Sequence, residues 1–118
     1  MKVLVCGDRN WTDREAIRSW LSKLQDWGYD TIIQGHARGA DKVSASEAKC
    51  MRLKVLTFPA KWEQYGRAAG PIRNQEMLDV GEPDLVVYFH NDLSKSKGTA
   101  DMVRRAKKAG IEVIDGGT

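Results

Sequence analysis

Five short apolar runs recur along this chain, and a longer segment, mostly helical in period, follows most of them. Their apolar residues are nearly continuous rather than alternating, which is typical of parallel strands whose two faces are both covered. Because strands alternate with helices, the sequence predicts a doubly wound α/β fold with right-handed crossovers. We expect a five-stranded, mainly parallel sheet in the order 3-2-1-4-5, with helices on both faces. The predicted strands are Lys2–Cys6, Thr31–Gln34, Lys54–Phe58, Asp84–His90 and Ile111–Asp115.

The first predicted helix has the clearest boundaries. Thr12 and Glu15 have the T-x-x-E spacing of a capping box, and Gly28 is expected to end the helix. An apolar stripe marks its inner face: Ile17, Trp20, Leu21, Leu24 and Trp27. Three further helices are predicted at residues 40–52, from Pro71 to a point before Gly81, and at residues 99–109.

The segment at residues 59–70 is predicted to be one long irregular loop. Irregular loops of that length in compact domains are usually functional or disordered. Trp62 and Tyr65 argue against disorder, so we expect a functional loop.

Length and composition narrow the class of protein. The chain has 118 residues, of which 42% are hydrophobic and 30% charged, as in an ordinary soluble domain. We therefore expect a single domain over residues 1–118. No apolar run approaches the length of a membrane span, and the apolar start is too short for a signal peptide, so we expect a cytoplasmic protein without a membrane partner.

The charge is only slightly positive, at +3. Such an excess permits anionic ligands without pointing to nucleic acid. The densest basic cluster, residues 104–110, is predicted at the solvated end of the last helix, where it complements the helix dipole.

Cysteine and histidine give no support for a metal or a disulfide. Cys6 and Cys50 fit no zinc spacing and are expected to be reduced and buried, and Cys6 has no visible partner for nucleophilic chemistry. His36 and His90 lack further ligands at a compatible spacing. We therefore expect no metal and no cofactor. Neither the dinucleotide fingerprint nor the P-loop motif occurs, so hydride transfer and NTP hydrolysis are unsupported.

The carboxyl ends of the predicted strands carry most of the glycine and many of the polar residues. Ligands of open parallel sheets bind at those ends, so the loops after strands one to four are the candidate site. Glycine lets a backbone approach a ligand, helix N-termini attract anions, and arginine binds phosphate with two donors. The same residues can instead serve tight turns, with Asp41 as a helix cap. The predicted ligand-binding residues are Gly7, Asp8, Arg9, Trp11, Gly35, Arg38, Gly39, Asp41, Arg73, Asn74, Gly98 and Thr99.

A family resemblance follows from these loops. The segments "VCGDRNWTD", "GHARGADK" and "GRAAGPIRNQEML" resemble the YspA-like, or cpYpsA-related, branch of the SLOG superfamily, and the likeness runs through nearly the whole chain. The resemblance implies a Rossmann-like fold and recognition of a nucleotide or a nucleotide-derived ligand such as one related to ADP-ribose. It also implies a bacterial or phage source and a homodimer or homotetramer.

Two more distant resemblances imply different activities. "RNQEM" and "KGTADM" resemble segments of the Lonely Guy phosphoribohydrolases, which cleave the N-glycosidic bond of nucleoside monophosphates. If the protein is an enzyme, that likeness makes Arg73 and Asp101 the candidate catalytic residues. However, Met102 stands at the position of the catalytic glutamate, and the neighbouring Asp101 points about 100° away on a helix. A thioether cannot replace such an acid.

"QGHARGAD" also resembles a segment of the DNA-processing protein A family, which binds single-stranded DNA. Trp11, Trp62 and Tyr65 are candidate stacking residues, and the same side chains can instead flank one base or pack on the core. We rank nucleotide binding without turnover first, phosphoribohydrolase activity second and single-stranded nucleic-acid binding third.

Overall fold

The computed structural model describes residues 1–117 and places the strands in one all-parallel sheet with the order β3-β2-β1-β4-β5. The central strand β1 pairs with β2 on one side and β4 on the other, so that Val3 faces both Ile32 and Leu85. The predicted fold class and strand order are confirmed. The strands are β1 (Lys2–Gly7), β2 (Thr31–Gln34), β3 (Lys54–Thr57), β4 (Leu85–Phe89) and β5 (Val113–Asp115).

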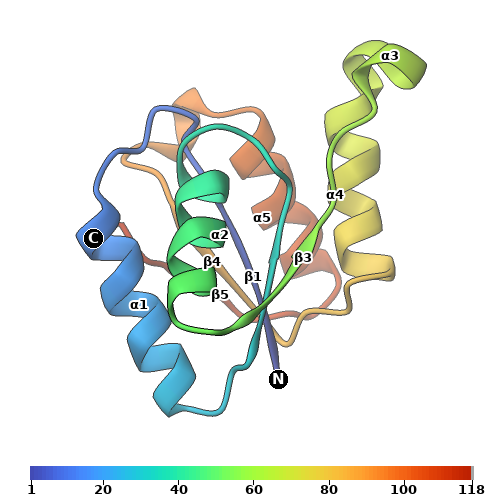
Figure 1. The fold of residues 1–118 in the computed structure, drawn as a ribbon. Helices are drawn as coiled ribbons and strands as arrows, with labels where there is room; N and C mark the ends of the chain where they lie inside the picture. The colour runs from blue at the N-terminus through green and yellow to red at the C-terminus, as the bar shows by residue number, and fades with distance from the viewer. Residues whose placement is uncertain (118) are drawn as a thin grey trace.

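Helices cover both faces of the sheet (Figure 1). α1 (Arg14–Asp26) and α2 (Ala40–Cys50) pack on one face, and α4 (Ala69–Asp79) and α5 (Gly98–Lys108) pack on the other. Each face has its own apolar cluster, and burying one large apolar side chain there stabilises the fold by about 1.5–3 kcal/mol. The first cluster is built around Ile17, Leu21 and Leu24, and the second around Met77, Met102 and Ala106.

Burial follows the position of each strand in the sheet. The inner residues of β1, β2 and β4 are almost completely buried, as their continuous apolar runs predict. β3 lies at the sheet edge, and its residues are half-buried or exposed. Because an edge strand is covered on fewer sides, Lys54 and Thr57 are tolerated there.

The start of α1 differs from the predicted capping box. Asp13, not Thr12, is the N-cap residue, and its Oδ1 accepts the N–H of Ala16 at 3.1 Å. Aspartate and threonine are both good caps, so the sequence alone did not separate them. Gly28 ends the helix region as expected, with a φ of +98°.

Trp27 was predicted on the inner face of α1, and this prediction was wrong. Its side chain is 58% exposed because the residue follows the helix end, where the helical period no longer sets its direction.

The predicted irregular segment is partly helical. It contains the short helix α3 (Trp62–Tyr65) and the 3-10 turn η1 (Gly66–Ala68), and α4 then begins two residues before Pro71. α3 projects from the body of the molecule beyond the end of α4 (Figure 1). None of its residues is buried, and Trp62 and Tyr65 are 59% and 41% exposed.

The two cysteines differ in their environments. Cys6 is buried in β1, as predicted, whereas Cys50 is exposed at the end of α2, so the prediction of two buried thiols was half wrong. Among the helices of residues 1–117, none is both long enough and apolar enough to cross a membrane.

Candidate functional site

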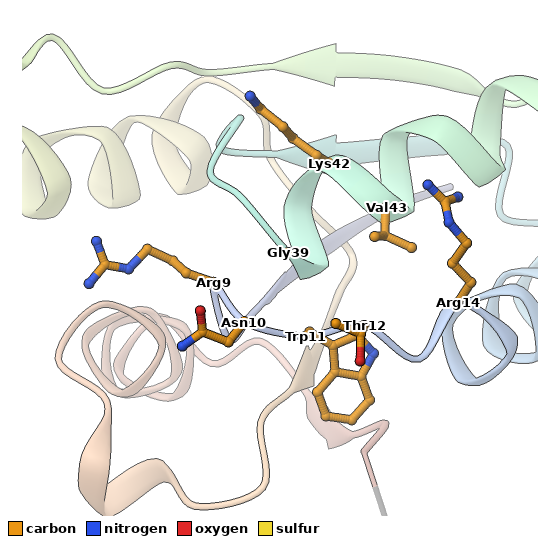
Figure 2. A pocket seen from close by; sticks show the side chains of 8 residues that line it. All are labelled: Arg9, Asn10, Trp11, Thr12, Arg14, Gly39, Lys42 and Val43. Carbon is orange, nitrogen blue, oxygen red and sulfur yellow. The ribbon is translucent and has the colours of Figure 1, made fainter.

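An open groove of about 630 Å³ lies between the loop after β1 and the N-terminal end of α2 (Figure 2). It lies at the carboxyl ends of the strands, where the doubly wound fold is expected to bind its ligand. The residues that line it are Arg9, Asn10, Trp11, Thr12, Arg14, Gly39, Lys42 and Val43.

Gly39 joins the two walls of the groove. A Cβ at this position would lie 2.3 Å from the carbonyl oxygen of Asp8 and 2.6 Å from the carbonyl carbon of Arg9. Its φ of +72° also favours glycine over other residues. The N–H of Ala40 donates to the carbonyl of Asp8 at 3.1 Å, which fixes the start of α2 against the loop after β1.

Two cations of the groove have no protein anion to neutralise them. Within residues 1–117, the side chains of Arg9 and Lys42 form no hydrogen bond or ion pair. Figure 2 shows both on the side of Gly39 away from Arg14, which lies beyond Val43. The N-terminal end of α2 has no side-chain cap and contributes the positive end of the helix dipole, which the carboxylate of Asp41 in the first turn offsets in part. This end of the groove is therefore suited to a negatively charged group.

The other end of the groove is aromatic and already partly neutralised. Arg14 and Arg18 both bind the carboxylate of Glu47 at 2.9 Å. Hydrogen bonds from these two guanidinium groups hold the pKa of Glu47 below its usual value, although desolvation opposes them. Trp11 is half-buried, and its Nε1–H donates to the carbonyl of Asp13 at 2.9 Å.

The orientation of the Trp11 ring is set by its packing. The ring packs on Phe89 with centroids 5.7 Å apart. Because Phe89 belongs to the apolar cluster under α1 and α2, the indole is an anchored wall of the groove rather than a mobile lid.

The loop after β2 is tied together from inside by Asp41. Its Oδ2 accepts the N–H groups of Gly35 and Ala37, both at 3.2 Å. Asp41 is not the N-cap of α2, because that position is occupied by Gly39. It does not line the groove either. Burial raises the pKa of Asp41 to about 6, against the opposing effect of the two N–H groups and the nearby Arg73.

Arg73 and Asn74 lie behind this loop rather than in the groove. A guanidinium N–H of Arg73 donates to the carbonyl of Gly35, and its Nε–H donates to Oδ1 of Asn74 at 3.1 Å. The amide of Asn74 donates to Oδ2 of Asp101 at 3.0 Å. Both predicted site residues are thus engaged in protein contacts.

Asp101 is the centre of an ion-pair cluster on α5. Its carboxylate binds Arg104 and Arg105, both at 2.8 Å, and accepts the amide of Asn74. Burial raises its pKa, but the hydrogen bonds from Asn74 and Arg105 and the two positive charges outweigh this and leave it below the usual value. Met102 is 1% exposed in the core, so a glutamate at that position would not face the groove.

The loop after β4 does not reach the groove. Gly98 is exposed, with nothing within 4 Å of an added Cβ, and Thr99 is buried, its N–H bonded to Oγ of Ser96. At the end of β1, Asp8 lies close to His90, with 3.9 Å between its Oδ2 and the Nε2 of the histidine. His36 is exposed, and its N–H donates to Oε1 of Gln34 at 2.6 Å.

The predicted site residues fall into distinct groups. Three line the groove: Arg9, Trp11 and Gly39. Four belong to the hydrogen-bonded region behind it: Gly35, Asp41, Arg73 and Asn74. Gly7 and Asp8 form the end of β1, Arg38 is exposed outside the groove lining, and Gly98 and Thr99 begin α5.

Five lining residues were not predicted from the sequence: Asn10, Thr12, Arg14, Lys42 and Val43. The sequence pattern did contain one signal for Lys42. It is the third residue of α2, and a cation in the first turn of a helix is opposed by the helix dipole.

The fold and the groove define a class: a doubly wound α/β domain with a cationic groove at the carboxyl ends of its strands. A sequence model of the family described as YspA, cpYpsA-related SLOG family matches residues 1–65. The "Gene 61 protein" of Mycobacterium phage D29 is 37% identical over 123 residues, which cover 98% of this chain and 96% of that protein. The chain therefore belongs to the YspA, cpYpsA-related SLOG family.

A solved structure shares the fold at low sequence identity. DNA processing protein A (DprA) from Streptococcus pneumoniae matches 95% of this chain with a TM-score of 0.75 and 17% identity. This chain spans 48% of the length of that protein chain. The likeness confirms the doubly wound architecture.

Proposed function

We propose that this protein binds a nucleotide or a nucleotide-derived ligand in the groove and acts as a sensor, effector or sequestering protein. The observation that carries the proposal is the pair of unneutralised cations, Arg9 and Lys42, beside Gly39 at the N-terminal end of α2, which has no side-chain cap. A phosphate bound there gains two charge-assisted contacts and the favourable end of a helix dipole.

The rest of the groove suits the body of a nucleotide. Trp11 and Val43 offer an apolar surface for a flat base, and Asn10 and Thr12 offer polar groups for a sugar. Membership of the SLOG family supports this ligand class. The phosphate thus lies at the end with Arg9 and Lys42, and the base lies toward Arg14.

Thermal shift and calorimetric titration with a panel of AMP, ADP, ATP, NAD and ADP-ribose test the proposal. At least one compound is expected to stabilise the wild-type protein. Arg9→Ala and Lys42→Ala should each lower the affinity for that compound about tenfold, since each removes a charge-assisted contact of roughly 1.5–3 kcal/mol.

Lys97→Ala is the matched control. Lys97 is exposed in the loop after β4 and lies outside the groove lining. Its substitution should leave the affinity unchanged within about twofold at moderate ionic strength. Equal effects of Lys42→Ala and Lys97→Ala would show that the groove is not the binding site. Arg38→Ala should resemble the control, because Arg38 does not line the groove.

Phosphoribohydrolase activity is a less supported alternative. Arg73 and Asp101, the residues that the distant resemblance would make catalytic, are both held by protein partners. An ionised carboxylate bound by two arginines is a poor proton donor. Release of free base from nucleoside monophosphates, followed by chromatography, would favour the enzyme.

Single-stranded nucleic acid is a third candidate ligand, favoured by one observation. On and beside α3, the exposed aromatic residues Trp62 and Tyr65 lie between the cations Lys61 and Arg67. Interleaved aromatic and basic residues are typical of surfaces that stack bases and bind phosphates. A salt-dependent mobility shift that is lost in Trp62→Ala but kept in Lys42→Ala would favour this reading.

The predicted homodimer or homotetramer also stays a prediction. Trp62, Tyr65 and Ile72 are exposed apolar residues on α3 and α4. An oligomeric interface over this surface would cover them, and light scattering coupled to size-exclusion chromatography measures the assembly.

A further inference from the structure

A continuous set of hydrogen bonds joins the loop after β2 to α4 and α5. It begins at the carbonyl of Gly35, passes through the side chains of Arg73 and Asn74, and ends at the carboxylate of Asp101. Asn74 is 4% exposed, so the centre of the set is buried. Buried polar groups that are fully paired hold one arrangement of the elements they join.

Gly35 shows how closely Arg73 approaches the loop. A Cβ on Gly35 would lie 2.3 Å from a guanidinium nitrogen of Arg73 and 3.0 Å from Oδ2 of Asp41. The backbone of Gly35 does not have a positive φ. The absence of a side chain at Gly35 therefore allows the close approach of the arginine, and any side chain there would displace the guanidinium.

The loop held in this way carries one wall of the groove. The inner side of the loop is bonded to Asp41 and Arg73. Three residues after Ala37 the chain enters α2, the helix that carries Lys42. Gly39 at the loop end contacts the backbone of Asp8 and Arg9. A displacement of the loop would therefore move Gly39 and Lys42 relative to Arg9.

Asn74 sets the orientation of Arg73. Its Oδ1 accepts from Arg73, while its Nδ2 donates to Asp101 and, at 3.3 Å, to the carbonyl of Gly98. With all of these bonds made, the side chain of Asn74 is fixed by α5 and in turn fixes the guanidinium. The first residue of α5 is thus linked to the loop after β2.

We propose that Arg73 and Asn74 are positioning residues of the groove, which hold the loop after β2 in place without touching the ligand. The binding part of this inference rests on the proposed function. Its structural part concerns the order of residues 35–39 and does not depend on any ligand.

Two variants disturb the contact between Arg73 and Gly35 by different means. Arg73→Ala removes the guanidinium, and Gly35→Ala keeps it but displaces it. If Arg73 positions the loop, both variants should weaken the binding of a fluorescent N-methylanthraniloyl-ADP probe about tenfold. The affinity of the double variant should be no lower than that of the single variant with the lower affinity. If Arg73 instead contacts the phosphate, Arg73→Ala should weaken binding while amide exchange at Gly35 and Ala37 stays as in the wild type.

Amide hydrogen exchange provides a readout that needs no ligand. The N–H groups of Gly35 and Ala37 should exchange about tenfold faster in both variants, because their bonds to Asp41 depend on the loop geometry. Arg67→Ala is the control, since Arg67 is exposed in η1 and has no bond to this loop. Unchanged exchange at Ala37 in both variants would overturn the proposal.

Failure of the inference and failure of the proposed function give different results. If the wild-type protein binds no nucleotide probe, the proposed function fails, while the exchange data still decide whether Arg73 orders the loop. If Arg73→Ala does not fold, Arg73→Lys replaces it in this experiment. Lysine keeps the positive charge but has one ammonium group in place of the planar guanidinium. This variant should give faster exchange at Ala37 than the wild type, and wild-type exchange would contradict the proposal.

Discussion

The loops after β2 and β4 look alike in the sequence and differ in the structure. Both contain glycine and basic residues, both precede a helix on the sheet, and both were predicted to hold a phosphate. The loop after β2 is packed against the backbone of the loop after β1 and bonded to Asp41 and Arg73. The loop after β4 is exposed at Gly98 and bonded mainly to itself, through Asp92 and Ser96.

The difference shows that glycine content alone does not identify a binding loop. Gly39 has a positive φ and touches the neighbouring loop, whereas Gly98 has open space around it and no unusual backbone angle. A wall of a binding site must be fixed before a ligand arrives, since ordering it on binding lowers the affinity. Of the two glycines compared, Gly39 is held against the backbone of another loop, whereas Gly98 has nothing within 4 Å of an added Cβ.

The largest expected effect separates the two glycines directly. Gly39→Ala should lower the free energy of unfolding by at least about 3 kcal/mol, because the methyl group meets the Asp8 carbonyl and the backbone angle is strained. Gly98→Ala should raise it by less than about 1 kcal/mol, because an added Cβ meets nothing within 4 Å and alanine favours the helix that begins there. Urea denaturation measures both. Equal losses in the two variants would remove the distinction between the loops.

The contribution of Asp41 should appear as a pH dependence. Its carboxyl has a pKa of about 6 in the folded protein and about 3.9 in an unfolded chain. The folded state therefore binds the proton more tightly, and the stability that protonated Asp41 contributes is full below pH 4 and lost as the pH rises through 6. The difference amounts to about 2 kcal/mol between pH 4 and pH 7.

Asp41→Asn separates the contribution of Asp41 to the pH dependence of stability from the contributions of the other carboxylates. The asparagine Oδ1 still accepts one of the N–H groups of Gly35 and Ala37, but the side chain no longer titrates. Unfolding free energies of the two proteins, measured from pH 4 to pH 7, should diverge by about 2 kcal/mol, with the wild type falling relative to the variant. If the two plots of unfolding free energy against pH were parallel, burial would not raise the pKa of Asp41.

The fold was predictable because both faces of the sheet are covered. That requirement makes β1, β2 and β4 continuous apolar runs, and the helix stripe of Ile17 and Leu21 follows from the same burial. Such patterns are local in the sequence. The exact start of α1 at Asp13 was not predictable, since two neighbouring residues are comparable caps.

The candidate site was only partly predictable, because its parts are set by contacts between distant segments. Arg9 and Gly39 lie in the groove as the strand-end rule predicts. Gly35 and Arg73 are also a glycine and an arginine, yet they bind each other rather than line the groove. They lie 38 positions apart in the sequence. No local pattern distinguishes an arginine that faces solvent from one that meets a carbonyl behind the loop.

The smallest expected effect on stability concerns the two cysteines, which differ in burial. Cys6 is buried in β1 among the apolar side chains that pack under α4 and α5. Burial together with the charge of Asp41 raises the pKa of its thiol well above the usual value. Cys50 is exposed at the far end of the helix. In the native protein, a thiol reagent such as 5,5′-dithiobis(2-nitrobenzoate) should modify Cys50 rapidly and leave Cys6 intact, and both should react in urea.

Cys50→Ser should change the free energy of unfolding by less than about 0.5 kcal/mol, as for other surface substitutions, and it leaves Cys6 as the only thiol. The reaction rate of Cys6 in that background then measures how often the structure around this thiol opens, and Asp41 and Arg73 lie near enough for their charges to act on it. Gly98→Ala should leave this rate unchanged, while Gly35→Ala, which displaces Arg73, should raise it. Rapid labelling of Cys6 in the native wild-type protein would show that this region is not fixed, and the contrast between the two loops would then be lost.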